Sequence, residues 1–289
     1  MINMTQKGCF LNIFKEKGIT SFDVIYKLRK ILNIKKIGHS GTLDPLAQGV
    51  LQVAVGNCTR LLEYLSDDKE YCAKIKFGYI SQTDDEEGEK TFISKPDFDI
   101  NLLNSTLSSF AGKISQIPPK YCALKVGGKK LCDIARKNEE LPEISPREVE
   151  IFNIKLLNFA PPDEAEIFVH CSKGTYIRSL VRDLGQKLGC GAYMSNLTRT
   201  RAGNFKIENS HKINDDILKY ALNPVDVLNL NKIEINEQQY KRVINGNPLE
   251  FDRCTENNKK YMLVFNNTLV SIANLSDNIL KMEKVFKTE

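Results

Sequence analysis

A single carboxylate, Asp44, stands in a segment whose composition suits a shaped loop. Residues 38–49 read GHSGTLDPLAQG, with three glycines and with Pro45 directly after the acid. Glycine can adopt backbone angles that are closed to other residues, and proline fixes its own φ, so we expect neither helix nor strand here. A carboxylate held on such a loop can act as a nucleophile or as a base. The competing interpretation is an Asp-Pro turn in which Asp44 caps backbone amides.

The residues on either side of this loop predict the rigid elements that would position Asp44. Residues 9–14 and 50–55 are apolar runs typical of strands, and the second reads as a buried strand. Ser21 is a candidate N-cap for a helix. The apolar residues that recur at helical spacing after it are Val24, Ile25, Leu28, Ile31 and Leu32. A loop held between such elements suits a catalytic position.

The following segments alternate between strand-like and helix-like patterns. Apolar residues alternate with Cys72, Lys74 and Lys76 between Tyr71 and Phe77, as in a half-buried strand. Further strands are predicted at 149–159, 164–171 and 192–200. Helices are predicted at 59–65, 102–110 and 176–188, the last closed by a glycine at 189.

Segment 38–49 resembles the signature of the TruB family of tRNA pseudouridine synthases. The match runs Gly38-His39-x-Gly41-Thr42-Leu43-Asp44-Pro45-x-Ala47-x-Gly49. Other parts of the family pattern recur in family order: Lys15-Glu16-Lys17-Gly18 with Thr20-Ser21, Tyr71, Thr83-Asp84, Ile117-Pro118-Pro119 through Ala123-Leu124-Lys125, and Gly174-Thr175-Tyr176-Ile177-Arg178-Ser179-Leu180. The resemblance covers about residues 8–205 and favours a catalytic role for Asp44.

The resemblance implies that uridine is isomerised: the N1–C1′ bond breaks, and the freed uracil rejoins the ribose through C5. The family aspartate maps to Asp44, which could attack C1′, add to C6 or remove the C2′ proton. The family arginine that pairs with this aspartate maps to Arg178, and a guanidinium can hold a carboxylate in one orientation; the alternative is an arginine on a helix surface. The family tyrosine maps to Tyr71, which would stack on the base and could remove the C5 proton, although such a tyrosine is also typical of plain core.

The resemblance also implies residues that bind the substrate. His39 would fill the space left by the extruded base, a step that costs roughly a few kcal/mol of stacking; the alternative is a structural histidine. Residues of the family pocket map to Lys15, Tyr176 and Leu197, and the match at 83–84 adds Asp84. Lys15 could equally be a solvated turn lysine, and Leu197 strand core. Candidate phosphate contacts, which would position RNA without reading its sequence, are Arg60, Lys125, Lys129, Lys130 and Arg199.

Positive charge is concentrated in one segment. The chain has 289 residues and a formal net charge of +5. Residues 113–137 contain one acid, Asp133, and seven basic residues: Lys113, Lys120, Lys125, Lys129, Lys130, Arg136 and Lys137. A phosphate backbone is the natural partner of such a patch, although a solvated surface loop can have the same composition. The segment resembles the thumb-like insertion of the family.

By this resemblance we expect an α+β fold: a mixed, mainly antiparallel sheet with flanking helices, an RNA-binding cleft and the thumb-like insertion. We place the pseudouridine synthase catalytic domain at residues 1–230, with the basic insertion at 113–137. Short strand-like pieces at 261–265, 269–273 and 279–286 predict a small β-rich module at 231–289, which resembles a PUA domain, an RNA-binding fold. The alternative is a β-rich tail that only packs on the body.

Other features of the sequence narrow the class of protein. It has no P-loop, no dinucleotide glycine fingerprint and no cluster with metal-ligand spacing, so we expect no cofactor and no metal. The eight cysteines lack C-x-x-C spacing and read as reduced, structural residues. No apolar run approaches the length of a membrane span, and the first residues lack a signal-peptide core, so we expect a soluble, cytoplasmic chain.

By the resemblance, we expect an enzyme that flips and isomerises the T-loop uridine at tRNA position 55. We expect a monomer that acts without guide RNA, because the short termini favour the stand-alone type over the guide-dependent relatives. One rival is a non-catalytic RNA-binding or tRNA-folding protein, against which intact Asp44, Tyr71 and Arg178 speak. Another is a glycoside hydrolase, which needs a second acid beside Asp44, and only Asp84 is a candidate.

Overall fold

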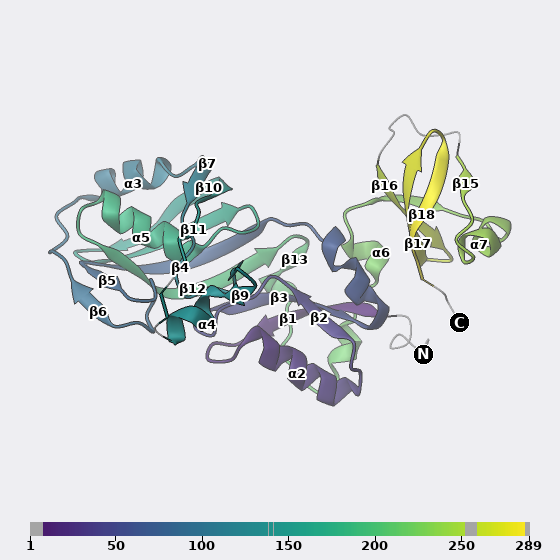
Figure 1. Ribbon diagram of the computed structural model, residues 1–289, viewed down its shortest axis with the longest axis horizontal. Helices are drawn as coiled ribbons and strands as arrows, with labels where there is room; N and C mark the ends of the chain where they lie inside the picture. The colour runs from purple at the N-terminus through teal and green to yellow at the C-terminus, as the bar shows by residue number, and fades with distance from the viewer. Residues whose placement is uncertain (1–7, 138, 141, 252–258, 287–289) are drawn as a thin grey trace.

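The computed structural model describes residues 8–137, 139–140, 142–251 and 259–286. The strands of its main sheet are β1 (Cys9–Lys15), β2 (Ile37–Ser40), β3 (Gln48–Val55), β4 (Lys69–Phe77), β7 (Gly112–Gln116), β10 (Arg147–Ala160), β11 (Glu164–Cys171), β12 (Ala192–Ala202) and β13 (Phe205–Lys206). Within the described residues they form a nine-stranded sheet with the order β1-β3-β12-β4-β11-β10-β7, and β2 and β13 are added beside β3 and β12 (Figure 1). Among the strands that the structure describes in this sheet, β12 and β3 are the one parallel pair, so the prediction of a mixed, mainly antiparallel sheet is confirmed.

Helices and short hairpins flank this sheet. The longer helices are α2 (Ser21–Leu32), α3 (Ile100–Ser108) and α5 (Ile177–Lys187). The shorter ones are η1 (Gly56–Tyr64), α4 (Leu131–Arg136), η2 (Ile207–Asn209), η3 (Ile217–Tyr220) and α6 (Pro224–Val227). Helix α7 (Glu237–Val243) packs instead in the core of the C-terminal part of the chain. Two small hairpins pair β5 (Tyr79–Ser81) with β6 (Lys90–Phe92) and β8 (Lys125–Val126) with β9 (Lys129–Lys130). The helix predicted at 59–65 is a 3₁₀ helix, η1, which begins earlier, at Gly56.

Helix α2 is fixed beside the Asp44 loop by its first turn. Thr20, one residue before the predicted N-cap, caps the helix: its side chain accepts from the Asp23 amide, and the Asp23 side chain accepts from the Thr20 amide. Ser21 is therefore the first helical residue, and its hydroxyl is free for another contact. It accepts from the Leu43 amide at 2.9 Å and donates to the Leu43 carbonyl at 3.1 Å. The helix start and the loop consequently form one unit.

The glycine-rich segment is only partly a loop, which corrects the prediction. Residues 38–40 belong to strand β2, and Gly49 belongs to β3, so the loop itself spans 41–47. Gly49 has a φ of +108°, and a Cβ there would lie 2.2 Å from the Arg199 carbonyl oxygen. Gly49 therefore permits the close approach of β3 and β12 rather than loop freedom.

Three buried clusters account for the core of the body. One, between the sheet and α3 and α5, includes Tyr71, Ile75, Leu103, Ile167 and Leu184. A second lies under α2. The third is shared with the C-terminal part of the chain and is described below. No helix among the described residues is long and apolar enough to cross a membrane. The seven cysteines within the described ranges are free thiols, and Cys254 lies outside them.

The C-terminal part forms its own sheet. Its strands are β14 (Asn231–Glu234), β15 (Leu249–Glu250), β16 (Lys260–Phe265), β17 (Thr268–Ser276) and β18 (Ile279–Val285). In the described ranges they form a five-stranded sheet in the order β14-β16-β17-β18-β15, at one end of the molecule (Figure 1). The β-rich character predicted here is confirmed. Met262 and Ile272 of this sheet pack in one cluster with Phe10 and Val50 of the body, so the two parts share a core.

Candidate active site

Asp44 lies on the 41–47 loop and lines a cavity of about 330 Å³. Its side chain is 37% exposed, and its Oδ2 lies 2.9 Å from Nη2 of Arg178. The main chain closes the Asp-Pro turn by itself, through a hydrogen bond from the Ala47 amide to the Asp44 carbonyl. No backbone amide of the described residues donates to the carboxylate. A guanidinium therefore holds this carboxylate, which is not used as a cap.

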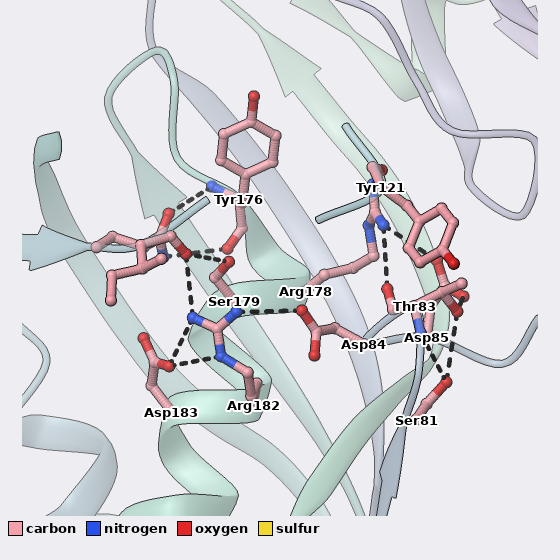
Figure 2. Close-up of polar contacts among 12 residues, drawn as sticks. Ser81, Thr83, Asp84, Asp85, Tyr121, Tyr176, Arg178, Ser179, Arg182 and Asp183 are labelled. Atoms are coloured by element: carbon pink, nitrogen blue, oxygen red, sulfur yellow. Dashed lines mark hydrogen bonds and ion pairs between the residues drawn. The ribbon is translucent and has the colours of Figure 1, made fainter. Parts of the chain in front are cut away.

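Arg178 is held at both ends of its guanidinium by groups that are themselves fixed. Its Nη1 donates to the Thr83 carbonyl at 3.1 Å and lies 3.5 Å from Oδ2 of Asp85. Its Nη2, which pairs with Asp44, also donates to the Tyr121 carbonyl at 2.9 Å. Figure 2 shows the Arg178 side chain reaching from α5 toward Thr83, Asp85 and Tyr121. Because Arg178 is only 4% exposed, it has little room to swing away from the carboxylate.

The start of helix α5 aims Arg178 into the cavity. Gly174, with a φ of +82°, turns the chain out of β11 toward the helix. The buried side-chain amide of Gln116 then accepts from the Tyr176 N–H at 2.8 Å and donates to the Tyr176 carbonyl at 3.1 Å. One turn later, Ser179 donates to the Ile117 carbonyl at 2.8 Å. The helix start is thus tied to the segment that follows β7.

Two neighbouring aspartates pair with two different arginines of α5 (Figure 2). Oδ2 of Asp84, which the sequence analysis named, lies 3.1 Å from Nη1 of Arg182. Asp85, which the sequence analysis did not single out, faces Arg178. Asp84 has a φ of +60°, so the chain turns between the two carboxylates. Burial raises the pKa of Asp84, and Arg182 opposes that shift. The sequence shows two adjacent acids after Thr83, and their spacing alone does not indicate which of them pairs with Arg178.

The cavity brings together six of the residues that the sequence analysis named: Asp44, Tyr71, Tyr176, Arg178, Leu197 and Arg199. Tyr71 stands on β4 and Leu197 on the neighbouring strand β12, and both are largely buried. Burial raises the pKa of Tyr71, and the nearby Arg199 lowers it by less, so the phenol is protonated at neutral pH. The walls therefore combine one carboxylate with cationic side chains, phenol rings and apolar surface, which suit a planar base attached to a sugar.

Lys15 does not line this cavity but binds the main chain of the Asp44 loop with its buried ammonium group. The residue is fully buried, and its Nζ donates to the carbonyls of Ile19 and Ala47, each at 2.7 Å, and to that of Glu16 at 3.0 Å. Burial lowers the pKa of Lys15 to about 8, and the charge of Asp44 opposes this shift. Lys15 thus anchors the last residue of the loop to the turn after β1.

Arg199, predicted to contact a phosphate, is also buried, with 1% of its surface exposed. Its Nη2 donates to the Gly41 carbonyl at 3.0 Å and its Nε to the Val50 carbonyl at 2.7 Å. Arg199 therefore ties the first residue of the loop to β3 while one side of it faces the cavity.

Other predicted residues lie outside the cavity. His39 is half-buried on β2; burial lowers its pKa, and its Nδ1 has no hydrogen-bond partner in the described part of the chain. Arg60 donates to the Val285 carbonyl at 3.1 Å and covers the Phe286 ring, so it joins η1 to the C-terminal sheet.

The basic insertion carries a hollow of its own. Lys125 and Lys129 line it together with Asp133. The Lys130 side chain lies outside the described part. Within the described ranges no group of three or more His, Cys, Asp or Glu side chains could hold a metal ion.

Comparisons with known proteins show the family of the chain. A family model described as "TruB family pseudouridylate synthase (N terminal domain)" matches residues 29–177, and "tRNA pseudouridylate synthase B C-terminal domain" matches residues 178–229. The chain is 41% identical over 286 residues to tRNA pseudouridine synthase B of Clostridium acetobutylicum, covering 95% of this chain and 98% of the relative. It is 47% identical over 204 residues to the protein of that name from Gloeobacter violaceus, covering 70% of each chain.

The fold also matches solved structures. A chain of a Cbf5-Nop10-Gar1 complex aligns with a TM-score of 0.74 and 26% identity, covering 99% of this chain and 87% of that one. A chain of an H/ACA RNP bound to a substrate RNA aligns with the same TM-score at 24% identity, over 100% of this chain and 88% of that one, and shows likeness of fold. The family models and the relatives establish that the chain belongs to the TruB family of pseudouridylate synthases and is an isomerase.

Proposed function

We propose that this enzyme converts uridine 55 in the T loop of tRNA into pseudouridine, with Asp44 as the carboxylate that drives cleavage of the N1–C1′ bond. The relatives named tRNA pseudouridine synthase B support tRNA as the substrate. The observation that carries the proposal is the ion pair between Asp44 and Arg178 on the wall of a cavity that also contains Tyr71. A buried guanidinium holds the carboxylate in one orientation, as attack at an electron-poor carbon requires.

The proposed reaction balances within the nucleotide. The N1–C1′ bond breaks, the uracil turns, C5 bonds to C1′, and the C5 proton leaves while N1 gains one. Asp44 acts at the sugar. Tyr71 stacks on the base, because its ring lies in the same cavity and its raised pKa keeps the phenol neutral as the base enters. Leu197 supplies apolar surface beside that ring.

The remaining parts of the molecule would present the RNA. The target base must leave the T loop to reach the cavity, and His39, on the strand that leads into the Asp44 loop, would fill the vacated space. Lys125 and Lys129 of the insertion are exposed and available to phosphates. We assign residues 1–230 to the catalytic domain, residues 113–137 to a thumb-like insertion and residues 231–289 to a PUA-like RNA-binding module. We further propose that the enzyme acts as a monomer without guide RNA.

The ion pairs of Asp84 and Asp85 argue against the alternative that this protein is a glycoside hydrolase. Such an enzyme needs a second carboxyl group that can donate or accept a proton opposite Asp44. Asp84 is paired with Arg182 and Asp85 with Arg178, so both are engaged by arginines. A non-catalytic RNA-binding protein would have no need for the guanidinium that orients Asp44.

The test is the release of tritium from tRNA transcripts labelled at uridine C5, since pseudouridine formation displaces that hydrogen. We expect stoichiometric release by the wild type, and none from Asp44→Asn or from a transcript whose T-loop uridine 55 is replaced by cytidine. Asp44→Asn should bind tRNA as the wild type does. Tight, salt-sensitive binding without release by the wild type would overturn the proposal in favour of the RNA-binding protein.

A further inference from the structure

A pair of cations converges at the Gly41 side of the cavity, apart from the ion pair of Asp44. Lys69 stands on β4 two residues before Tyr71 and on the same face of the strand. Arg199 stands opposite Tyr71 on β12, and both cations line the cavity. A Cβ added to Gly41 would lie 3.2 Å from Cε of Lys69 and 3.5 Å from Nη1 of Arg199. The missing side chain of Gly41 thus leaves room for both head groups.

Both cations are buried without a carboxylate partner. Lys69 is 9% exposed and Arg199 1%. Their hydrogen bonds to the main chain are from Lys69 to the Asp67 carbonyl at 2.7 Å, and from Arg199 to the carbonyls of Gly41 and Val50. In the described ranges neither forms an ion pair. Buried charges are ordinarily paired, so two neighbouring unpaired cations need an explanation.

The carboxylates nearest to Lys69 are engaged by other cations. Asp67 lies 2.6 Å from Lys173, and Asp68 lies 2.6 Å from Arg201 and 2.9 Å from His170. Burial and the charge of Arg199 accordingly lower the pKa of Lys69, and the two aspartates oppose this shift. The free enzyme therefore holds an uncompensated positive charge on this wall.

We propose that Lys69 and Arg199 form a binding site for one backbone phosphate that adjoins the target uridine. The inference rests on the proposed function, because it takes the occupant of the cavity to be a nucleotide of RNA. With the ribose at Asp44 and the base at Tyr71, the sugar–phosphate backbone has to leave the cavity along another wall, and Lys69 and Arg199 provide a cationic one. A phosphate carries a permanent negative charge and several acceptor oxygens, which match the donor groups of Lys69 and Arg199 and favour the charged form of the lysine, whereas the uracil is neutral until the bond breaks. Lys69 would thus hold the nucleotide in register with Asp44.

The test removes the charge of one phosphate at a time. T-arm RNAs carrying a methylphosphonate at the linkage 5′ or 3′ to the target uridine are compared with unmodified RNA in single-turnover tritium release. For the wild type, one of the two substitutions should lower the single-turnover rate of release roughly tenfold to a hundredfold, the effect of losing a charge-assisted hydrogen bond. For Lys69→Gln, unmodified RNA should show a similar loss, and that same methylphosphonate should cost little more.

Equal losses for wild type and Lys69→Gln at both linkages would overturn the proposal, because the lysine and the phosphate would then act independently. Lys219→Gln is the control for the loss of one positive charge. Lys219 is an exposed residue of η3 that pairs with Asp216, so this variant should retain the wild-type response. Release from unmodified RNA by the wild type tests the proposed function separately.

Stability gives a readout that distinguishes binding from a structural role. If the role of Lys69 is to bind a phosphate, Lys69→Met should have a thermal stability in the absence of RNA equal to or above that of the wild type, since the substitution removes an unpaired buried charge. A clear loss of thermal stability in Lys69→Met, with full activity in Lys69→Gln, would identify a structural lysine and refute the site.

Discussion

Replacing Arg178 by lysine tests whether the geometry of the guanidinium, rather than its charge, positions Asp44. The two terminal nitrogens of Arg178 serve two carboxylates and two backbone carbonyls at once. Lysine keeps the charge, but it offers one nitrogen on a shorter reach and cannot span both ends. We expect it to lose at least one of the contacts to Asp44 and Asp85.

The expected magnitude follows from what the contact does. A charge-assisted hydrogen bond is worth about 1.5–3 kcal/mol, and a displacement of about 1 Å at a reacting group can lower the rate roughly a hundredfold. Arg178→Lys should therefore reduce the single-turnover rate of tritium release by roughly tenfold to a hundredfold. Its Kd for tRNA should stay within about threefold of wild type, because Arg178 is buried and bonded within the protein.

Arg182→Lys is the matched control. Arg182 lies one turn further along α5, where it pairs with Asp84 and Asp183, and it does not line the cavity. Its side chain is 27% exposed, and partly solvated ion pairs contribute only about 0–1 kcal/mol. We expect less than a threefold change in rate. A wild-type rate for Arg178→Lys, or a loss in rate matched by an equal loss in binding, would refute the positioning role.

Three further predictions follow from the neighbours of this pair. Asp85→Asn should slow single-turnover release by at least about tenfold while Asp84→Asn changes it by less than about threefold; the reverse order would show that the ion pairs are misassigned. In the folded protein the pKa of Lys15 is about 8, below its ordinary 10.5. Between these pH values Lys15 is protonated in the unfolded chain and largely neutral in the folded one. The free energy of unfolding should therefore rise with pH across this window. The wild type should gain on the order of 3 kcal/mol relative to Lys15→Met between pH 8 and 10.5 in urea titrations, and a pH-independent gap would contradict the shift. Gly49→Ala places a methyl against the Arg199 carbonyl at positive φ, so it should lower the free energy of unfolding by about 3 kcal/mol or more; a loss below about 1 kcal/mol would mean that the two strands separate easily.

The sequence predicted the regular elements well, because their signals are local. Alternation from Tyr71 to Phe77 gives β4, and the apolar spacing after Ser21 gives α2. The loop was less well predicted, since glycines at 38 and 49 lie in strands. There glycine serves close approach between segments far apart in the chain, and no local pattern reveals such a contact.

The same limit applies to the charged residues around the cavity. Lysine and arginine are ordinarily exposed, so nothing in the sequence marks Lys15, Lys69 and Arg199 as buried. Their burial depends on carbonyls supplied by distant strands and turns. The pairing of Asp85 rather than Asp84 with Arg178 likewise depends on one positive φ.

The core that the C-terminal sheet shares with the body fixes the distance between the surface of that sheet and the surface around the Asp44 cavity. Hydrogen bonds reinforce the junction, from Tyr64 to Glu283 at 2.9 Å and from Arg60 to the Val285 carbonyl. The sheet therefore cannot swing on a flexible linker as a tethered module would. Under the proposal that the C-terminal sheet binds RNA, a substrate that touches both this sheet and the body has to present two features at one set separation, and its folded shape would then be part of what the enzyme selects.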